Sequence, residues 1–309
     1  LGLPPAVVRR LAGAPIVRDG RALDPQAQLA LVMQRRLRRR PPEEVGLAQA
    51  RAELDVNAAT LAPRPRAGVT VEDQTIEGPG GVLPIRVYRP RGAETPAPAL
   101  IYFHGGGFVV GGLDSHDAVC QALAAEGCCV VIAVDYRLAP EHRFPAAVED
   151  ALAAFDEVRA GAEALGVDPG RLAVGGDSAG GNLAAVVALE RQGAAGPRMQ
   201  VLLYPAVDLT MSFPSIQGLG SGFFLEATTM AWYVATYLGE EGERRDPRAS
   251  PWFAGSLRGA APAYVLTAGF DPLRDEGDAY AGRLAAEGVT VRHRCFDGMF
   301  HGFLNAGGA

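Results

Sequence analysis

Short apolar runs and longer stretches with helical spacing alternate along most of the chain. Two strand-like runs, 69–76 and 83–88, flank a glycine-rich turn cluster at 77–81, which predicts an antiparallel hairpin. Further apolar runs of strand length follow at 99–103, 129–134, 171–175, 199–204, 263–268 and 289–295. Stretches with helical spacing separate them at 115–126, 146–160, 182–189 and 275–287. Repeated β–α units with short apolar strands favour, together with the hairpin, a mostly parallel eight-stranded sheet covered by helices on both faces.

Two segments do not follow this alternation. Residues 1–65 contain helical patterns, for example 26–37, but no strand pattern, and residues 207–255 interrupt the alternation with many aromatic residues. Open α/β sheets bind their ligands at the carboxyl ends of the strands. We therefore expect 1–65 and the insertion 207–255 to form a helical cap over that end of a main domain spanning 66–309. Most of the aromatic side chains should pack the cap onto the main domain, and a few should line a pocket. The pocket candidates are Phe108, Phe213, Phe223, Phe224 and Trp232.

Composition restricts the classes of partner. With 309 residues, of which 48% are hydrophobic, the chain can bury one large core. Its formal net charge of −6 argues against a nucleic-acid partner, because phosphate binding requires a basic surface. The basic cluster at 35–40 is interpreted as the solvated end of a helix rather than as an anion site.

The cysteines and the apolar stretches bear on the cellular location. Four cysteines show no C-x-x-C pair and no metal-ligand spacing with the five histidines, so no metal site is expected. They are typical of the reduced, mostly buried cysteines of a cytoplasmic protein. The longest apolar stretches, 128–134 and 183–189, are too short to cross a bilayer, and residues 1–20 lack the apolar core of a signal peptide. We expect no stable membrane insertion.

One pentapeptide carries the chemistry of an activated nucleophile. Gly176-Asp177-Ser178-Ala179-Gly180 follows an apolar run and opens a helical stretch. In a G-x-S-x-G motif at a strand-to-helix turn, the glycines permit a very close approach of the chain, and the serine is held in a strained backbone conformation. The hydroxyl of Ser178 would then project near a helix N-terminus, where developing negative charge is favoured.

An acyl-transfer serine needs a base and a group that orients the base, which in this fold class follow in the order Ser, Asp or Glu, His. Asp271 comes directly after a predicted strand and is the preferred acid. Asp275, Glu276 and Asp278 fall on the following helix, where the helix dipole alone accounts for acids in the first turn. His301 lies in a loop after the last predicted strand and is the preferred base. The other histidines considered, His116, His142 and His293, are interpreted as structural or surface residues.

The third element is the run His104-Gly105-Gly106-Gly107-Phe108, directly after a predicted strand. Successive glycines let backbone N–H groups approach a substrate oxygen with no side chain in the way. We expect the N–H groups of Gly106 and Gly107, with that of Ala179 after the nucleophile, to form an oxyanion hole.

Taken together, these motifs resemble the hormone-sensitive lipase family of α/β-hydrolases, specifically its bacterial esterases with Asp before the nucleophile. The likeness extends through the run 135–142 and through Tyr204-Pro205, so it covers about residues 65 to 304. It implies an α/β-hydrolase fold with a helical cap and the hydrolysis of short- to medium-chain carboxylic esters without a cofactor. The resemblance carries the family's catalytic residues over to Ser178, Asp271 and His301, and its oxyanion glycines to Gly106 and Gly107.

Two other functional classes stay open at this point. Plant relatives of the family act as hormone receptors that lack the catalytic histidine, so a receptor for a small ligand is one alternative, although His301 is present here. A lyase or an amidase that uses the same oxyanion hole is another, and fold analogy cannot separate it from an esterase. Relatives often pair through the edge of the last strand, which leaves a homodimer as an open expectation.

Overall fold

The computed structural model describes residues 3–36, 40–61 and 66–305. Its main sheet contains β3 (Val69–Gly78), β4 (Gly81–Pro90), β5 (Ala97–Phe103), β6 (Val130–Val134), β7 (Val167–Asp177), β8 (Gln200–Leu203), β9 (Ala263–Phe270) and β10 (Val291–Phe300). These eight strands are ordered β10–β9–β8–β7–β5–β6–β4–β3. β3 pairs with β4, and β4 with β6, in antiparallel fashion, while every other neighbouring pair is parallel. The mostly parallel eight-stranded sheet and the opening hairpin predicted from the sequence are thus confirmed.

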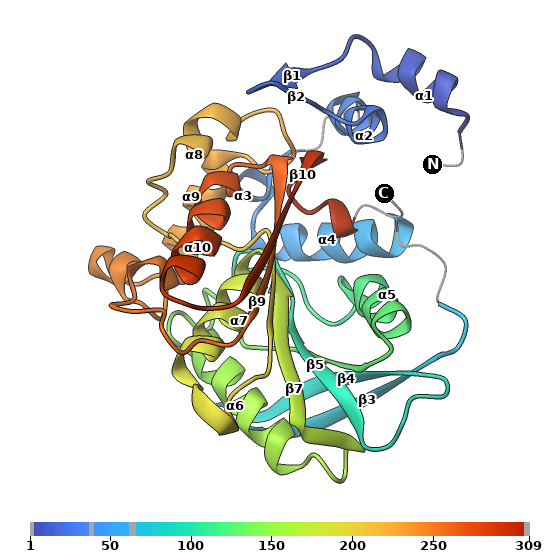
Figure 1. The fold of residues 1–309 in the computed structure, drawn as a ribbon. Coiled ribbons are helices and arrows are strands. Elements are labelled where there is room, and N and C mark those ends of the chain that lie inside the picture. Colours follow the sequence, from blue (N-terminus) through green and yellow to red (C-terminus); the bar gives the residue numbers. More distant parts are fainter. Residues whose placement is uncertain (1–2, 37–39, 62–65, 306–309) are drawn as a thin grey trace.

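Helices cover the sheet on both faces, as Figure 1 shows. On one face lie α6 (Ala146–Ala160), α7 (Ala179–Glu190) and α10 (Arg274–Ala286), and on the other lies α5 (Asp117–Gly127). Along β5 the side chains alternate between the two cores that result: Ile101 and Phe103 belong to the larger core with α6, α7 and α10, whereas Leu100 and Tyr102 belong to the smaller core with α5. Because successive side chains of a strand point to opposite faces, a strand buried on both faces must be apolar throughout.

Several strands are longer than the predicted ranges, while β6 and β8 are slightly shorter. β10 continues to Phe300, past the predicted end at residue 295, with an irregular register between Phe296 and Phe300. The carbonyl of Gly298 accepts a hydrogen bond from the N–H of Asp24, 2.9 Å away. The Asp-Gly pair at 297–298 is typical of a turn, but here a bulge and a contact with the N-terminal segment keep the chain extended.

The N-terminal segment is mainly helical, with α1 (Pro5–Ala12), α2 (Pro25–Arg36), α3 (Pro42–Val45) and α4 (Leu47–Leu61). It also contains a short hairpin of two strands with two residues each, β1 (Val17–Arg18) and β2 (Arg21–Ala22). The expectation of no strand in this segment was therefore wrong. The side chain of Arg21 donates to Asp297 at 2.8 Å, which ties the hairpin to β10. From the basic cluster, Arg35, Arg36 and Arg40 are exposed, and residues 37–39 lie outside the described residues.

The insertion 207–255 contains α8 (Pro214–Leu219), α9 (Ala227–Tyr237) and the short 3-10 helices η2 (Glu241–Arg245) and η3 (Pro251–Phe253). It contacts the N-terminal helices directly. The hydroxyl of Thr229 on α9 donates to Glu43 on α3 at 2.8 Å, and Arg35 donates to the carbonyl of Gly222 at 2.9 Å. The remaining 3-10 helices are η1 (Gly193–Ala195) and η4 (Phe303–Asn305). Over the described ranges, no helix combines the length and the apolar character needed to cross a membrane.

Glu276 anchors the loop after β8 from the first turn of α10. It is fully buried at 0% exposure, and its Oε1 accepts the N–H groups of Val207 and Asp208 at 2.7 and 3.1 Å. The interpretation of Glu276 through the helix dipole alone was therefore wrong. Burial raises the pKa of Glu276 well above its usual range, and the nearby carboxylates of Asp208 and Asp271 add to this shift, against the lowering effect of the two N–H groups.

The substitution Glu276→Gln should therefore change how stability depends on pH. In the unfolded chain this carboxyl ionises near its ordinary pKa of 4.5, while burial holds the pKa of the folded one well above that value. The folded state then binds more protons above that pH, so stability falls as the pH rises, by up to about 1.4 kcal/mol per pH unit. Glutamine keeps an oxygen acceptor and does not ionise, so the variant should gain stability relative to the wild type from pH 5 to pH 7.

Urea unfolding of both proteins at the two pH values measures this gain. The exposed Glu77 on β3 offers a control, since Glu77→Gln should leave the difference from the wild type the same at both pH values. An equal difference at pH 5 and pH 7 for Glu276→Gln would show that the buried carboxyl is ionised.

Candidate active site

Ser178 lies at the sharp turn between β7 and α7. Its backbone has φ +55° and ψ −118°, a conformation that non-glycine residues rarely adopt. A Cβ on Gly176 or on Gly180 would overlap the carbonyl oxygen of Phe103 at the end of β5. Both glycines are therefore required for β7, α7 and β5 to approach one another, and the side chain between them stays partly exposed.

His301 and Asp271 complete a continuous series of hydrogen bonds with this serine. Nε2 of His301 lies 3.0 Å from Oγ of Ser178, and Nδ1 lies 2.8 Å from Oδ2 of Asp271. Asp271 is fully buried and His301 is 8% exposed, so the carboxylate end of the series is shielded from water while the hydroxyl end is open. The three residues follow β7, β9 and β10 and meet at the carboxyl ends of these strands, as the sequence predicted.

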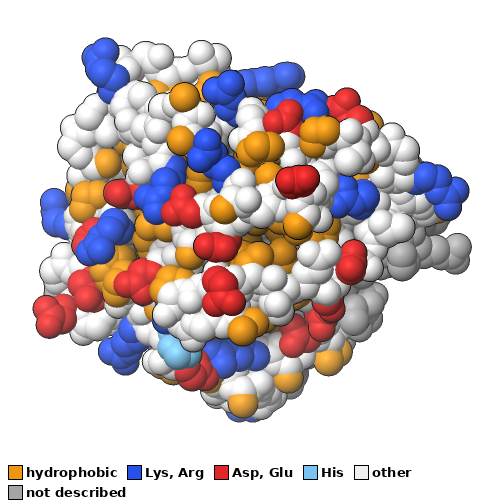
Figure 2. Space-filling model, turned by 90° about the horizontal axis from the view of Figure 1, so that it is seen from below, with side chains coloured by type: hydrophobic (Ala, Val, Ile, Leu, Met, Phe, Trp, Pro, Cys, Tyr) orange, Lys and Arg blue, Asp and Glu red, His pale blue; other side chains and the backbone are white. Residues whose placement is uncertain are grey.

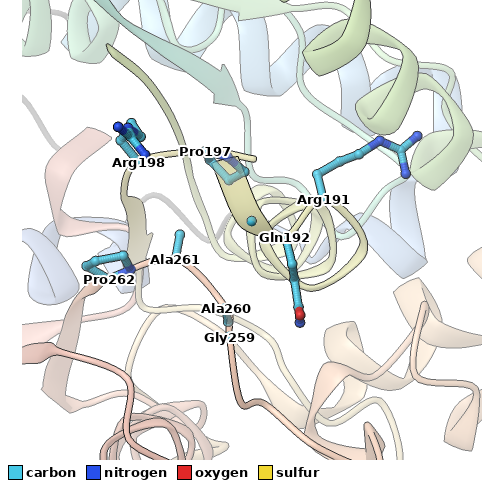
Figure 3. A pocket seen from close by; sticks show the side chains of 9 residues that line it. Arg191, Gln192, Pro197, Arg198, Gly259, Ala260, Ala261 and Pro262 are labelled. Carbon is cyan, nitrogen blue, oxygen red and sulfur yellow. The ribbon is translucent and has the colours of Figure 1, made fainter. Parts of the chain in front are cut away.

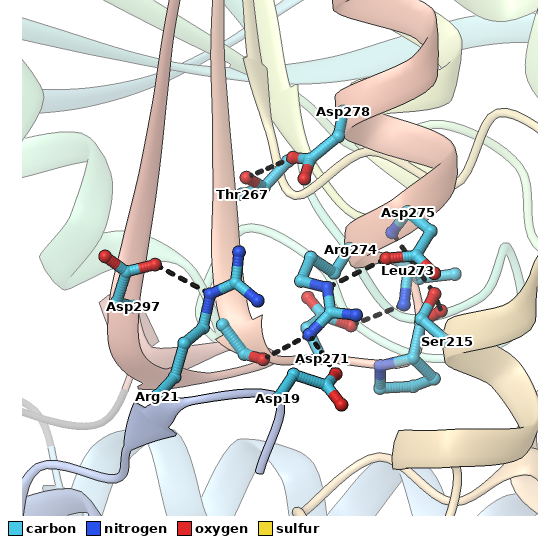
Figure 4. Close-up of polar contacts among 12 residues, drawn as sticks. Asp19, Arg21, Ser215, Thr267, Asp271, Leu273, Arg274, Asp275, Asp278 and Asp297 are labelled. Carbon is cyan, nitrogen blue, oxygen red and sulfur yellow. Dashed lines mark hydrogen bonds and ion pairs between the residues drawn. The ribbon is translucent and has the colours of Figure 1, made fainter.

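The second oxygen of Asp271 is held by the backbone. Oδ1 accepts the N–H of Leu273 at 2.8 Å, a local turn that fixes the direction of the carboxylate (Figure 4). Arg274 lies beside this turn, where its Nη1 donates to Asp19 at 2.9 Å and to the carbonyl of Gly269 at 3.2 Å. The N-terminal hairpin thus braces the strand end that carries Asp271.

The other acids considered from the sequence lie in different contacts. Asp275 pairs with Arg274 at 2.8 Å, and Asp278 accepts the hydroxyl of Thr267 at 2.7 Å (Figure 4). Asp278 also lies 3.0 Å from Nε2 of His293, so that histidine belongs to a separate cluster between β9, β10 and α10. Of these acids, Asp271 is the one hydrogen-bonded to His301.

The glycine run after β5 lies where the sequence places it, directly beside the nucleophile turn. Gly106 and Gly107 have φ +120° and +62°, and a Cβ there would collide with the carbonyl oxygen of Val110 and with the ring of Tyr233, respectively. Within the described ranges, the N–H groups of Gly106, Gly107 and Ala179 have no hydrogen-bond acceptor. Their donors are available to a ligand.

The five pocket candidates lie in different surroundings. Phe224 is 50% exposed and stacks on Phe300 with ring centroids 5.2 Å apart. Its ring lies 3.9 Å from the position that a Cβ on Gly302, the residue after His301, would take. The ring of Trp232 lies 5.2 Å from that of Tyr233, which covers Gly107. Phe224 therefore lies beside the residue that follows His301, whereas Trp232 lies beside the tyrosine that covers Gly107.

The other three candidates are held in aromatic pairs. Phe108 is buried and stacks on Tyr237 at 4.0 Å, Phe223 is buried against Phe270 at 5.2 Å, and Phe213 packs edge-on against Trp252 at 5.2 Å. The pairs of Phe108 with Tyr237 and of Phe223 with Phe270 join the insertion to the main domain, as expected for its aromatic residues. Phe213 and Trp252 both belong to the insertion, so their contact packs the insertion against itself.

Two tyrosines near the site were not among the residues predicted for it. Tyr204 directly follows β8 with φ +37°, and its ring lies edge-on to His301 with centroids 4.8 Å apart. Tyr233 covers Gly107 from α9. The Tyr-Pro pair at 204–205 was a usable signal for the first, whereas only the tertiary packing of α9 identifies the second.

Figure 3 shows a depression whose lining residues do not include the catalytic candidates. It measures about 300 Å³ and is lined by residues that follow α7 or precede β8 and β9, including Arg191, Arg198 and Ala261. It therefore lies at the amino ends of these strands. Figure 2, seen from below, shows acidic and basic side chains interspersed with hydrophobic ones on that side of the molecule.

In the described residues, no group of three or more histidine, cysteine or acidic side chains could hold a metal ion.

Comparisons with known proteins agree with this geometry. A family model described as the alpha/beta hydrolase fold matches residues 100–305. The chain is 44% identical over 308 residues to the carboxylic ester hydrolase LipN of Mycobacterium tuberculosis, covering 95% of this chain and 80% of that protein. It is 43% identical over 266 residues to an ethyl acetate hydrolase of Pseudomonas putida, covering 84% and 83%.

Solved structures give the same result. The ester hydrolase EH1AB1 from the metagenome of Lake Arreo superposes with a TM-score of 0.87 at 42% identity, covering 92% of each chain. A thermostable esterase from Pseudomonas putida superposes with a TM-score of 0.88 at 36% identity, covering 92% of this chain and 90% of that one. The chain therefore belongs to the alpha/beta-hydrolase family, in the branch that includes the esterases similar to hormone-sensitive lipase.

Proposed function

We propose that this protein is a serine carboxylesterase that hydrolyses short- to medium-chain carboxylic esters through an acyl-Ser178 intermediate. The observation that carries the proposal is the series Ser178–His301–Asp271, with distances of 3.0 and 2.8 Å. Beside it lie three backbone N–H groups that have no acceptor among the described residues. The relatives with 43 and 44% identity are named as an ethyl acetate hydrolase and a carboxylic ester hydrolase, which supports the same reaction class.

The geometry gives each group a defined step. Nε2 of His301 accepts the hydroxyl proton of Ser178 as Oγ attacks the ester carbonyl carbon. The carbonyl oxygen becomes an oxyanion that accepts hydrogen bonds from the N–H groups of Gly106, Gly107 and Ala179. When the tetrahedral intermediate collapses, the C–O bond to the alcohol breaks and His301 returns the proton to the departing alcohol. A water molecule then attacks the acyl carbon, with His301 again as the base. The bond between the acyl carbon and Oγ of Ser178 breaks, His301 returns the proton to Oγ, and the acid is released.

Asp271 acts on the base rather than on the substrate. Its Oδ2 accepts the Nδ1 hydrogen of His301, which leaves Nε2 free to accept the proton of Ser178. Its carboxylate also stabilises the positive charge that His301 carries between the two proton transfers. Because Asp271 is fully buried, this attraction is weakly screened by water.

We propose that the segments 1–65 and 207–255 together form the cap that encloses the acyl chain. Contacts between α9 and α3, and between Arg35 and Gly222, join the two segments. Phe224, beside Gly302, and Trp232, beside Tyr233, are the candidates from the sequence that we propose to line the cap, with Tyr233 as an addition. The hydrogen bond between His301 and Ser178 argues against a receptor that has lost its catalytic histidine.

Location and assembly stay predictions from the sequence. The four cysteines are free, which supports a reducing cytoplasmic environment. β10 is the outermost strand at one edge of the sheet, which makes it the candidate edge for a homodimer. An ester is the proposed small-molecule partner, and neither a cofactor nor a nucleic acid has a part in this mechanism.

Replacing the nucleophile should abolish turnover and leave the fold intact. Ser178→Ala is expected to lower kcat for p-nitrophenyl butyrate by about 10⁴-fold or more, because no acyl-enzyme can form. Circular dichroism and the thermal midpoint should match those of the wild type. In the wild type, intact-protein mass spectrometry with a fluorophosphonate should show one adduct, located at Ser178. Undiminished ester hydrolysis by the variant would refute the assignment.

A methyl group on the glycine run should displace the proposed oxyanion donors and so harm catalysis. Gly106→Ala is expected to lower kcat by roughly a hundredfold, the usual cost of losing one oxyanion donor, because its Cβ would push the loop away from Val110. Gly282→Ala on α10 is the matched control, since nothing lies within 4 Å of its Cβ position. The control should keep wild-type kinetics and be slightly more stable, because alanine favours a helix. Equal kinetics for both variants would exclude this loop as the oxyanion site.

A further inference from the structure

A buried carboxylate that the mechanism does not use lies between the nucleophile turn and the glycine run. Asp177 directly precedes Ser178 and is 3% exposed. Its Oδ1 accepts the hydroxyl of Tyr102 at 2.7 Å and the backbone N–H of Gly105 at 2.9 Å. The carboxylate thus joins β5, the glycine run and the residue next to the nucleophile.

The contact with Gly105 is unusually close. A Cβ on Gly105 would lie 2.5 Å from Oδ2 of Asp177, so the carboxylate rests directly against the backbone of this residue. Gly105 immediately precedes Gly106 and Gly107, whose N–H groups are the proposed oxyanion donors. The hydrogen bond to the N–H of Gly105 therefore fixes the chain direction at the point where the donor loop begins.

His116, at the start of α5, is the second member of this buried group. It is 4% exposed, and its Nε2 lies 3.4 Å from Oδ1 of Asp177 and 3.3 Å from the N–H of Gly105. Its Nδ1 lies 2.9 Å from the hydroxyl of Ser115, which bonds to the backbone of Gly112. The ring orientation is thereby set from the opposite side.

Nε2 of His116 also lies close to the segment that carries the base. Asn305 follows His301 by four residues, and its Nδ2 lies 3.3 Å from Nε2 of His116. The group therefore contacts all three segments of the site: the glycine run, the nucleophile turn and the chain after the base.

The environment keeps Asp177 ionised despite its burial. Burial by itself would raise its pKa, but the adjacent His116 and the hydrogen bonds from His116 and Tyr102 outweigh this effect and lower the pKa to about 2. Hydrogen bonds to an ionised acceptor are shorter and stronger than those between neutral groups. A buried carboxylate is therefore a stiff support for the N–H of Gly105.

We propose that Asp177, oriented by His116, is a positioning residue that holds the donor loop 105–107 at the angle needed to bind the oxyanion. Its catalytic effect rests on the proposed esterase function, while the contact with the loop stands independently of it. A carboxylate that served only folding would support global stability without a selective effect on the transition state.

The test compares Asp177→Asn with Asp278→Asn. Asp278 is a matched control because it also accepts a hydroxyl hydrogen bond, from Thr267, and also faces a histidine, His293, but lies away from the donor loop. With p-nitrophenyl butyrate, Asp177→Asn should lower kcat by roughly tenfold to a hundredfold and leave KM within about threefold of the wild-type value. The expected loss of kcat does not exceed that caused by losing one oxyanion donor. Asp278→Asn should keep the wild-type kcat.

Two further measurements separate positioning from folding. An alkyl trifluoromethyl ketone forms an oxyanion when Ser178 attacks it, so its inhibition constant should rise in Asp177→Asn by about the same factor as kcat falls. Hydrogen–deuterium exchange of the peptide 104–108 should become faster in Asp177→Asn and remain unchanged in Asp278→Asn. Wild-type kcat and wild-type exchange in Asp177→Asn would overturn the proposal, as would a loss of activity shared equally with the control.

The exchange measurement also separates this proposal from the proposed function. If the wild type hydrolysed no ester, the esterase assignment would fail, and the exchange of 104–108 would still decide whether Asp177 holds the loop. If Asp177→Asn did not fold, Tyr102→Phe removes one hydrogen bond to the same carboxylate with almost no change of shape. A several-fold loss of kcat in Tyr102→Phe, together with faster exchange of the peptide 104–108, would support the proposal. A wild-type kcat together with wild-type exchange in this variant would overturn it.

Discussion

The close approach of the nucleophile turn to the end of β5 is the constraint on which the site depends. A side chain at either Gly176 or Gly180 would overlap the carbonyl of Phe103. With both glycines present, the central strands β5 and β7 end side by side, and Ser178 projects at the start of α7. The glycine run that follows β5 then lies next to the hydroxyl, because the two strands are direct neighbours in the sheet. Strain at one serine is maintained by the packing of two strands and a helix.

The surroundings of two buried carboxyl groups, Asp177 and Glu276, shift their pKa values in opposite directions. Asp177 has a hydroxyl, a backbone N–H and a histidine around it, and its pKa is lowered to about 2. Burial raises the pKa of Glu276, and its two backbone N–H groups do not outweigh this effect and that of the nearby carboxylates. The ionised group can hold the loop of the proposed oxyanion donors through a charge-assisted hydrogen bond. Glu276 anchors the chain after β8 through the N–H groups of Val207 and Asp208.

Segments distant in sequence brace the strand ends that carry the site. Arg21 of the N-terminal hairpin bonds to Asp297 in β10. Asp19 of the same hairpin accepts a hydrogen bond from Arg274, beside the turn of Asp271. Tyr233 of α9 covers Gly107. The proposed cap therefore contributes to the geometry of the catalytic groups as well as to the enclosure of a substrate. A change in the cap should be expected to affect the chemistry even when it touches no substrate.

The sequence by itself determined the elements whose signal is local. The alternation of apolar runs predicted the eight strands and their covering helices, because period and apolar character follow from burial on both faces of a sheet. The spacing of Gly176, Ser178 and Gly180 predicted the nucleophile turn, since only glycine permits that approach. Chain order and position after a strand also indicated Asp271 and His301, which the structure brings together with Ser178.

Tertiary structure alone decided the features that depend on what lies opposite. Contacts with the N-terminal segment extend β10 through an Asp-Gly pair that is locally typical of a turn. Burial and two backbone contacts, rather than the helix dipole alone, account for Glu276, and the packing of α9 makes Tyr233 a neighbour of the glycine run. The environment of Asp177 was equally hidden, because its partners are up to 75 residues away. Local patterns encode backbone conformation, whereas burial and hydrogen-bond partners are set by segments that meet only in the folded chain.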